Sequence, residues 1–98
     1  TDFVEPDLTT LGGITPFMKV AHLAEAHGLP VTSHGSHDLH VHVLAAIPNA
    51  TYLEWFAFDL SPYMEQPLQV AGGFAIAPDR PGHGIALDWA RLATHELT

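Results

Sequence analysis

The sequence contains no cysteine, which excludes a disulfide framework and thiolate catalysis. It also lacks a signal-peptide pattern and any apolar run long enough to cross a bilayer. We therefore expect a cytoplasmic protein without a membrane partner.

Basic residues are scarce in this chain. Three Lys and Arg residues stand against eleven Asp and Glu residues, which gives a formal net charge of −8 with the histidines neutral. Because basic side chains supply most of the affinity for nucleic acid, this balance argues against a nucleic-acid partner. Histidine, in contrast, is abundant. The eight imidazoles make the net charge sensitive to pH near neutrality and raise the question of metal binding.

The chain is long enough for one small domain, and hydrophobic residues at 47% can supply its core. Residues 1–7 are expected to form the end of a strand and residues 8–13 a loop. Thr15 and Pro16 are typical of a helix start, with Thr15 as the N-cap, and this helix should run to about His27. Its apolar face is predicted to consist of Phe17, Val20, Ala21 and Ala24.

A second strand and helix follow. Residues 31–33 form a strand that ends at His34, Ser36 caps a helix that ends at Pro48, and residues 50–55 form a third strand. The order β-α-β-α-β with short loops favours parallel strands joined by right-handed crossovers. The buried face of the second helix is predicted to consist of Leu39, Val43 and Ala46.

The pattern changes from Ser61 onward. Residues 68–77 predict a hairpin with a glycine turn, and residues 79–84 predict a rigid loop. Asp88 is placed to cap a last short helix.

Three parallel strands and two helices cannot cover both faces of a sheet, and they leave two bare edges. The predicted fold class is therefore α/β, with residues 1–60 as the last three βα units of a barrel of roughly 250 residues. Residues 61–98 form a separate C-terminal segment. A small complete α/β domain that pairs its edges in a dimer is the alternative.

Three ionisable residues lie where the predicted strands end: Asp7, His34 and Glu54. The C-terminal ends of parallel strands meet at one rim, where side chains face a ligand. We therefore predict one site that moves a proton, with histidine as a base suited to neutral pH. Purely structural alternatives are that Asp7 caps the following loop, that His34 is only hydrogen-bonded, and that Glu54 is a surface charge.

Three histidines near the start of the second helix invite a zinc interpretation. His37 and His40 share a helix face, whereas His42 points about 200° around the axis from His40. Since a closed zinc site needs four ligands in tetrahedral geometry, we favour packing or hydrogen bonding around the predicted site. The aromatic residues Trp55, Phe56 and Phe58 either line a pocket or pack beneath another domain.

Seven short motifs resemble the C-terminal third of the enolase superfamily, in its mandelate racemase and muconate lactonizing enzyme-like branch. They follow the order and spacing of that family and cover nearly the whole chain. The motifs are Glu5-Pro6-Asp7, Leu11-Gly12-Gly13-Ile14-Thr15, Ala24-Glu25-Ala26-His27-Gly28-Leu29-Pro30, Ser33-His34-Gly35-Ser36, Ala45-Ala46-Ile47-Pro48-Asn49, Tyr52-Leu53-Glu54 and Asp79-Arg80-Pro81-Gly82.

This resemblance implies a modified (β/α)7β TIM-type barrel of which strands six to eight are present, with residues 61–98 forming a hairpin and short helix that pack on the capping domain. Asp7 and His34 match the general-base dyad of that branch, and Glu54 matches a glutamate that hydrogen-bonds the substrate carboxylate. The family's Mg²⁺ ligands and its second acid/base lie on earlier strands. The implied partners are a small carboxylate substrate, the remaining barrel and capping domain, and further copies in a homo-oligomer.

The reaction that the resemblance implies is removal of the proton beside a carboxylate. The stretches His34-Gly35 and Asp79 to Gly84 look most like acid-sugar dehydratases, so we expect dehydration of an aldonate or aldarate. A racemase or epimerase of a 2-hydroxy acid is the alternative. A non-catalytic histidine-rich metal-binding module is the alternative from another class.

Overall fold

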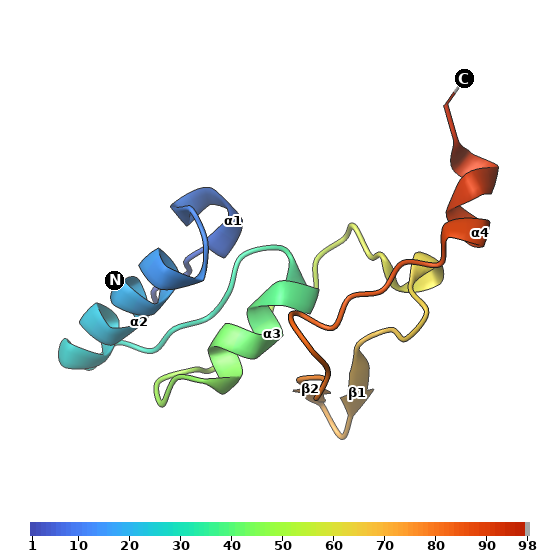
Figure 1. Cartoon of the computed structure of the whole chain (residues 1–98). Coiled ribbons are helices and arrows are strands. Elements are labelled where there is room, and N and C mark those ends of the chain that lie inside the picture. The colour runs from blue at the N-terminus through green and yellow to red at the C-terminus, as the bar shows by residue number, and fades with distance from the viewer. Residues whose placement is uncertain (98) are drawn as a thin grey trace. The chain divides into compact units, whose positions relative to one another are not determined.

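The computed structural model describes residues 1–97 and contains two compact units, one spanning Thr1–Phe56 and the other beginning at Ala57. No helix in the described part of the chain is long and apolar enough to span a membrane. The helices of the first unit are α1 (Leu8–Leu11), α2 (Ile14–Ala26) and α3 (His37–Ala45) (Figure 1).

Three extended segments run parallel in the first unit, and Val31 lies in the middle one. Val31 pairs with Val4 on one side and with Ala50 on the other. The Val31 N–H donates to Asn49 O, and the Thr51 N–H donates to Val31 O, both at 2.8 Å. The predicted parallel order of the three strands is thereby confirmed.

The parallel segments are shorter than the strands predicted for residues 31–33 and 50–55, because each pair consists of a single bridge. Pro6 and Pro30 lie beside these bridges and have no N–H to donate. Proline can contribute only its carbonyl, as Pro6 does by accepting from the His34 N–H at 3.3 Å. The prolines therefore limit how far a regular ladder extends along the segments.

A short helix occupies part of the stretch that we predicted as a loop, residues 8–13. α1 begins at Leu8 because Asp7 caps it, and Asp7 Oδ1 accepts from the Thr9 N–H at 2.9 Å. At the other end, the Gly12 N–H donates to Leu8 O. The loop prediction was wrong because four residues form a helical turn when both ends are capped.

α2 begins at Ile14, directly after Gly13, and not after Thr15 as predicted. Pro16 then occupies the third helical position. Its missing N–H is no loss there, because the first four N–H groups of a helix have no partner within it. The C-terminal end of the helix was predicted correctly, since Gly28 follows it in the left-handed region at φ 66°.

α3 begins after Ser36 as predicted, but no side chain caps the helix there. Its predicted buried face was partly wrong: Val43 is buried, Leu39 is half-buried and Ala46 is exposed. The sequence predicts packing or hydrogen bonding for His37 and His40, and both are buried, but the helical period does not reveal their hydrogen-bond partners. The other buried residues of α3 are His37, Asp38, His40, Val41 and Leu44.

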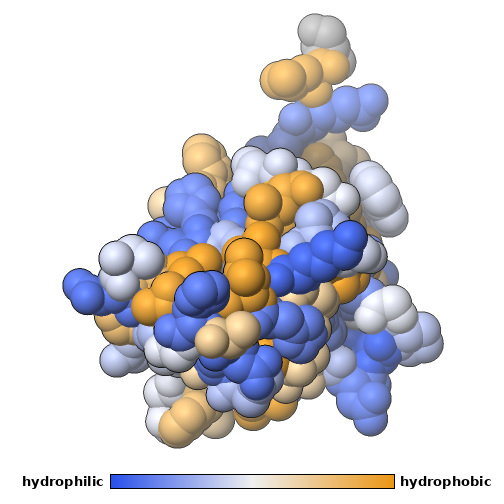
Figure 2. All heavy atoms as spheres, turned by 90° about the vertical axis from the view of Figure 1, so that its left-hand side faces the viewer, coloured by the Kyte–Doolittle hydropathy of each residue, from blue (hydrophilic) through white to orange (hydrophobic). Residues whose placement is uncertain are grey.

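Apolar residues from α1, α2, α3, the turn after α3 and the middle segment form the core of the first unit. Its members are Leu8, Phe17, Ala21, Ala24, Val31, Val43, Leu44 and Ile47. Other apolar residues reach the surface, as the orange areas of Figure 2 show. Phe3 and Tyr52, whose ring centroids lie 6.4 Å apart, are both exposed. Exposed aromatic rings on two of the parallel segments are expected when helices cover only one face of the sheet.

The second unit contains the predicted hairpin. β1 (Gln69–Ala71) pairs antiparallel with β2 (Phe74–Ile76) around the turn at Gly72-Gly73 (Figure 1). Two 3-10 helices also belong to this unit, Ser61–Tyr63 and Ala93–His95.

The last helix, α4 (Trp89–Leu92), is capped by Asp88 as predicted, with Asp88 Oδ1 accepting from the Arg91 N–H at 3.1 Å. Arg80 has a structural task in the preceding loop. Its Nη1 donates to Gln66 Oε1 at 2.6 Å, and its Nε donates to a loop carbonyl at 3.1 Å.

Candidate active site at the ends of the parallel segments

Asp7 follows the first parallel segment and uses its two carboxylate oxygens differently. Oδ1 accepts from the Thr9 N–H at 2.9 Å and from the Thr9 hydroxyl at 2.8 Å. Oδ2 lies 3.7 Å from Nδ1 of His34. The helix cap therefore fixes the carboxylate, and the second oxygen faces the imidazole.

The surroundings of Asp7 favour its ionised form. Its side chain is 14% exposed, and this burial by itself raises the pKa. The two hydrogen bonds from Thr9 and the proximity of His40 and His34 outweigh that effect, so the pKa of Asp7 lies below its ordinary value of 3.8. Near neutral pH a negative charge therefore stands beside His34.

His34 ends the middle segment, and its side chain is 56% exposed. The distance of 3.7 Å to Asp7 allows an ion pair and is slightly longer than a hydrogen bond. Such contacts are often longer without substrate than in a reacting complex. The ring centroid of Phe56 lies 6.2 Å from that of His34. An exposed imidazole with one nitrogen facing a carboxylate can exchange a proton with a ligand through its other nitrogen.

Glu54 ends the third segment and is joined to the middle one by two hydrogen bonds. Its N–H donates to Oγ of the fully buried Ser33 at 3.1 Å. Its Oε2 accepts from the Gly35 N–H. Because Gly35 directly follows His34, these bonds hold the Glu54 carboxylate next to the residue that carries the imidazole.

The structure thus brings Asp7, His34 and Glu54 to the same end of the parallel segments, and the chemical roles of the three residues stay predictions. Sequence reasoning missed Ser33 and Gly35 as hydrogen-bonding members of this site. Gly35 has φ 68°, and a Cβ atom at this position would lie 4.0 Å from Asp7 Oδ2. The sequence signal that could have indicated these two residues is their position on either side of a histidine at the end of a strand.

Two histidines of α3, His37 and His40, accept hydrogen bonds from backbone N–H groups. His37 Nδ1 accepts from the Phe56 N–H at 3.2 Å, and the ring stacks on Trp55 with centroids 4.2 Å apart. His40 Nε2 accepts from the Leu8 N–H at 3.0 Å. These bonds occupy lone pairs that a zinc ion needs. Among residues 1–97, the structure brings no three His, Cys, Asp or Glu side chains together in a way that could hold a metal ion.

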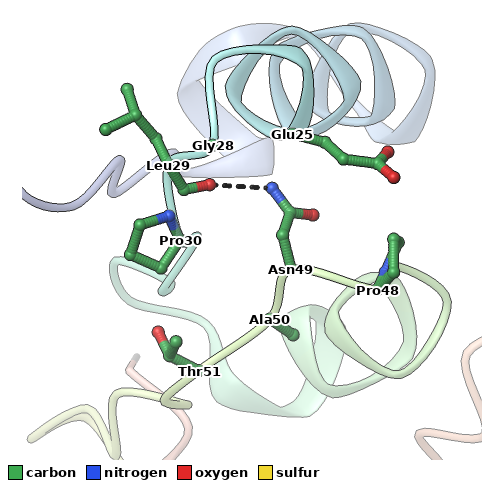
Figure 3. Close-up of a pocket in the computed structure, with 8 residues that line it drawn as sticks. All are labelled: Glu25, Gly28, Leu29, Pro30, Pro48, Asn49, Ala50 and Thr51. Atoms are coloured by element: carbon green, nitrogen blue, oxygen red, sulfur yellow. Dashed lines mark hydrogen bonds between the residues drawn. The ribbon is translucent and has the colours of Figure 1, made fainter.

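A cavity of about 370 Å³ lies at the opposite end of the parallel segments, where Pro30 and Asn49 precede them (Figure 3). Asn49 lines it and has a structural task. Its Nδ2 donates to Leu29 O at 3.0 Å and to Ala21 O at 3.2 Å. The Asn49 amide therefore joins α2 and the loop after it to the start of the third segment.

The sequence matches the family described as enolase C-terminal domain-like over residues 1–91. It is 54% identical over 88 residues to 3,6-anhydro-α-L-galactonate cycloisomerase from Streptomyces coelicolor, which covers 90% of this chain and 24% of that protein.

Two solved structures share both sequence and fold with the chain. The crystal structure of a racemase from Streptomyces coelicolor A3(2) with bound magnesium gives a TM-score of 0.85 at 50% identity, covering 95% of this chain and 25% of that one. The L-talarate dehydratase from Polaromonas sp. JS666, complexed with Mg and L-glucarate, gives a TM-score of 0.79 at 40% identity, covering 89% of this chain and 23% of that one. The chain thus spans about a quarter of the length of these relatives.

Proposed function

Because the chain belongs to the enolase C-terminal domain-like family, we propose that it supplies the proton-abstracting end of a barrel enzyme that acts on acid sugars. The observation that carries this proposal is the contact between Asp7 Oδ2 and Nδ1 of the exposed His34. The names of two relatives, a cycloisomerase of an anhydro-galactonate and a talarate dehydratase, support a sugar carboxylate as the substrate class.

In this proposal His34 is the general base. Its Nε2 takes the proton from the carbon next to the substrate carboxylate, which leaves an electron pair that forms the enolate. Asp7 orients the ring through Nδ1, and its negative charge stabilises the imidazolium that results. Glu54 binds the substrate carboxylate through a shared proton, while the Gly35 N–H fixes its Oε2.

The fate of the enolate depends on the group attached to the next carbon. If a free hydroxyl leaves, the carbon–oxygen bond breaks, the oxygen takes a proton, and water is lost. This is the dehydration that we predicted from the sequence. If the oxygen belongs to an ether ring, the same bond cleavage opens the ring, and the product is an isomer of the substrate. Ring opening is our second candidate, and the 54% identity to the cycloisomerase favours it.

Mass spectrometry of the product distinguishes these two outcomes. The full-length enzyme that carries this segment is incubated with galactarate and, separately, with 3,6-anhydro-L-galactonate. Dehydration lowers the mass by that of one water, whereas ring opening leaves it unchanged. An enzyme that converts neither compound, and exchanges the α-proton of neither in D₂O, would contradict the proposed substrate class.

The rest of the catalytic apparatus is proposed to lie outside this segment. Since no cluster among residues 1–97 suits a metal, the magnesium ion that two relatives bind would be held by side chains of the remaining barrel. Residues 61–98 are proposed to return to a capping domain, and the assembled enzyme to be a homo-oligomer. A racemase would need a second base on the opposite face of the substrate, and we propose that this base also lies in the remaining barrel.

The His34 assignment is tested by replacing this residue with asparagine in the full-length enzyme. In D₂O, the wild type exchanges the α-proton of an acid sugar on one stereochemical face, and His34→Asn loses that exchange. The matched control is His22→Asn, because His22 is an exposed histidine on α2. Exchange that persists in His34→Asn would show that another group is the base. Zinc bound tightly by the segment alone, without exchange activity in the whole enzyme, would instead support the metal-binding module.

A further inference from the structure

His40 is a buried side chain whose two ring nitrogens both bond to the backbone. The residue is 0% exposed, and its ring lies against Phe17 with centroids 5.7 Å apart. Nε2 accepts from the Leu8 N–H at 3.0 Å. Nδ1 lies 2.8 Å from Gly35 O and 3.0 Å from Ser36 O. His40 therefore connects the start of α1 with the loop that leads into α3.

The partners of His40 define which nitrogen carries the proton. A backbone N–H directed at Nε2 requires a lone pair on that atom, and two carbonyl oxygens at Nδ1 require an N–H there. We therefore assign the ring proton to Nδ1 and a lone pair to Nε2. Asp7 Oδ1 lies 3.6 Å from Nε2, but that oxygen already accepts two hydrogen bonds from Thr9. The backbone partners of the two nitrogens thus fix the place of the ring proton.

The two backbone positions that His40 holds are adjacent to the proposed catalytic pair. Leu8 directly follows Asp7, and Gly35 directly follows His34. A rotation at either position would turn the side chain that precedes it. The bonds made by His40 therefore restrict both sides of the 3.7 Å contact at the same time.

We propose that His40 is a positioning residue, which sets the separation and the orientation of Asp7 and His34 through its bonds to Leu8 and Gly35. The inference rests on the proposed function, because it assigns His40 a task in the same proton transfer. His40 acts through its neighbours and contacts no reacting atom.

Three variants of the full-length enzyme test the proposal. His40→Phe fills the space of the ring and removes both hydrogen bonds. His40→Gln keeps one acceptor and one donor, with its carbonyl toward the Leu8 N–H and its amide toward Gly35 O. His22→Phe makes the same replacement as the first variant at a histidine of α2 that is 59% exposed.

Steady-state kinetics separate positioning from a purely structural role. In His40→Phe, kcat is expected to fall on the order of 10- to 100-fold while KM changes by less than about twofold, because small displacements of catalytic groups have effects of this size. His40→Gln is expected to recover most of the loss, and His22→Phe to match the wild type. A folded His40→Phe enzyme with kcat within about twofold of the wild type would overturn the proposal. An equal loss in His40→Gln would also overturn it, since the cause would then be packing.

NMR spectroscopy tests the positioning role of His40 independently of turnover. With ¹⁵N-labelled histidine, the wild type should show His40 protonated at Nδ1 only, and His40→Phe should shift the ¹⁵N resonance of His34 Nδ1 as the contact with Asp7 changes. If His40→Phe does not fold, the shift is measured in His40→Gln, where it should stay at the wild-type position. A wild-type enzyme that leaves acid sugars untouched but passes the ¹⁵N test contradicts the proposed function alone. Protonation of His40 at Nε2, or an unmoved His34 resonance in a folded His40→Phe enzyme, contradicts the positioning role.

Discussion

Replacing Asp7 with asparagine separates the two tasks that the structure gives to this side chain. The asparagine carbonyl can still accept from the Thr9 N–H and hydroxyl, which lie 2.9 and 2.8 Å from Asp7 Oδ1. Asparagine and aspartate are about equally good N-caps, so α1 keeps its start. Asp7→Asn removes the negative charge that faces His34 and replaces the accepting Oδ2 by an amide NH₂ group.

The size of the expected effect follows from the distance of 3.7 Å between Asp7 Oδ2 and His34 Nδ1. Two unit charges at this separation interact by about 1 kcal/mol in water and by about 4 kcal/mol at an effective dielectric constant of roughly 20. Because the His34 side chain is 56% exposed, solvent screening places the effect near the lower end. Loss of about 1 to 1.4 kcal/mol of imidazolium stabilisation slows α-proton abstraction roughly fivefold to tenfold.

The assay is α-deuterium exchange by the full-length enzyme, measured together with its thermal unfolding. Asp7→Asn should lose exchange rate with little change in stability, whereas Asp7→Ala should lose both, since an N-cap replaced by alanine costs about 0.5 to 2 kcal/mol. An exchange rate in Asp7→Asn within twofold of the wild type would refute the role of the Asp7 charge. Equal losses of stability in the two variants would refute the assignment of Asp7 as a cap.

Two further predictions concern stability. Phe17→Ala should lower the free energy of unfolding by about 3 to 5 kcal/mol, because Phe17 is 0% exposed in the core. The control is Ile14→Ala, at a position that is 61% exposed, which should change the free energy of unfolding by less than about 0.5 kcal/mol. Urea titration of both full-length variants measures the difference, and equal effects would contradict the core assignment. Since the pKa of folded Asp7 lies below 3.8, its stabilising contribution is fully present above that pH and is lost as the pH falls through the lower folded value. Denaturation midpoints compared at about pH 5 and about pH 3 should therefore drop less in Asp7→Asn than in the wild type, and parallel drops would contradict the lowered pKa.

Elements with strong local signals could be predicted from the sequence. The turn at Gly72-Gly73, the cap at Asp88 and the left-handed Gly28 after α2 each depend on residues within a few positions of one another. Prediction failed where two starting signals competed. Thr15 is a good cap, but the turn at Gly13 lets α2 start two residues earlier than the Thr15-capped helix would.

The candidate site could be predicted only as far as strand order determines it. Parallel segments bring Asp7, His34 and Glu54 to one end, and that much follows from the alternation of strands and helices. The bonds of His40 could not be predicted, because the helical period gives the face on which a residue lies but not its partner. Leu8, which donates to His40 Nε2, is 32 positions away in the sequence.

Gly35 links two side chains through its own backbone. Its N–H is bonded to the carboxylate of Glu54, and its carbonyl to the imidazole of His40. Only the two backbone dihedral angles of Gly35 separate the half-buried Glu54 carboxylate from the fully buried His40 ring. A substitution that shifts the His40 ring, for example at Phe17, would consequently change the orientation of the Glu54 carboxylate although no residue in contact with Glu54 is replaced.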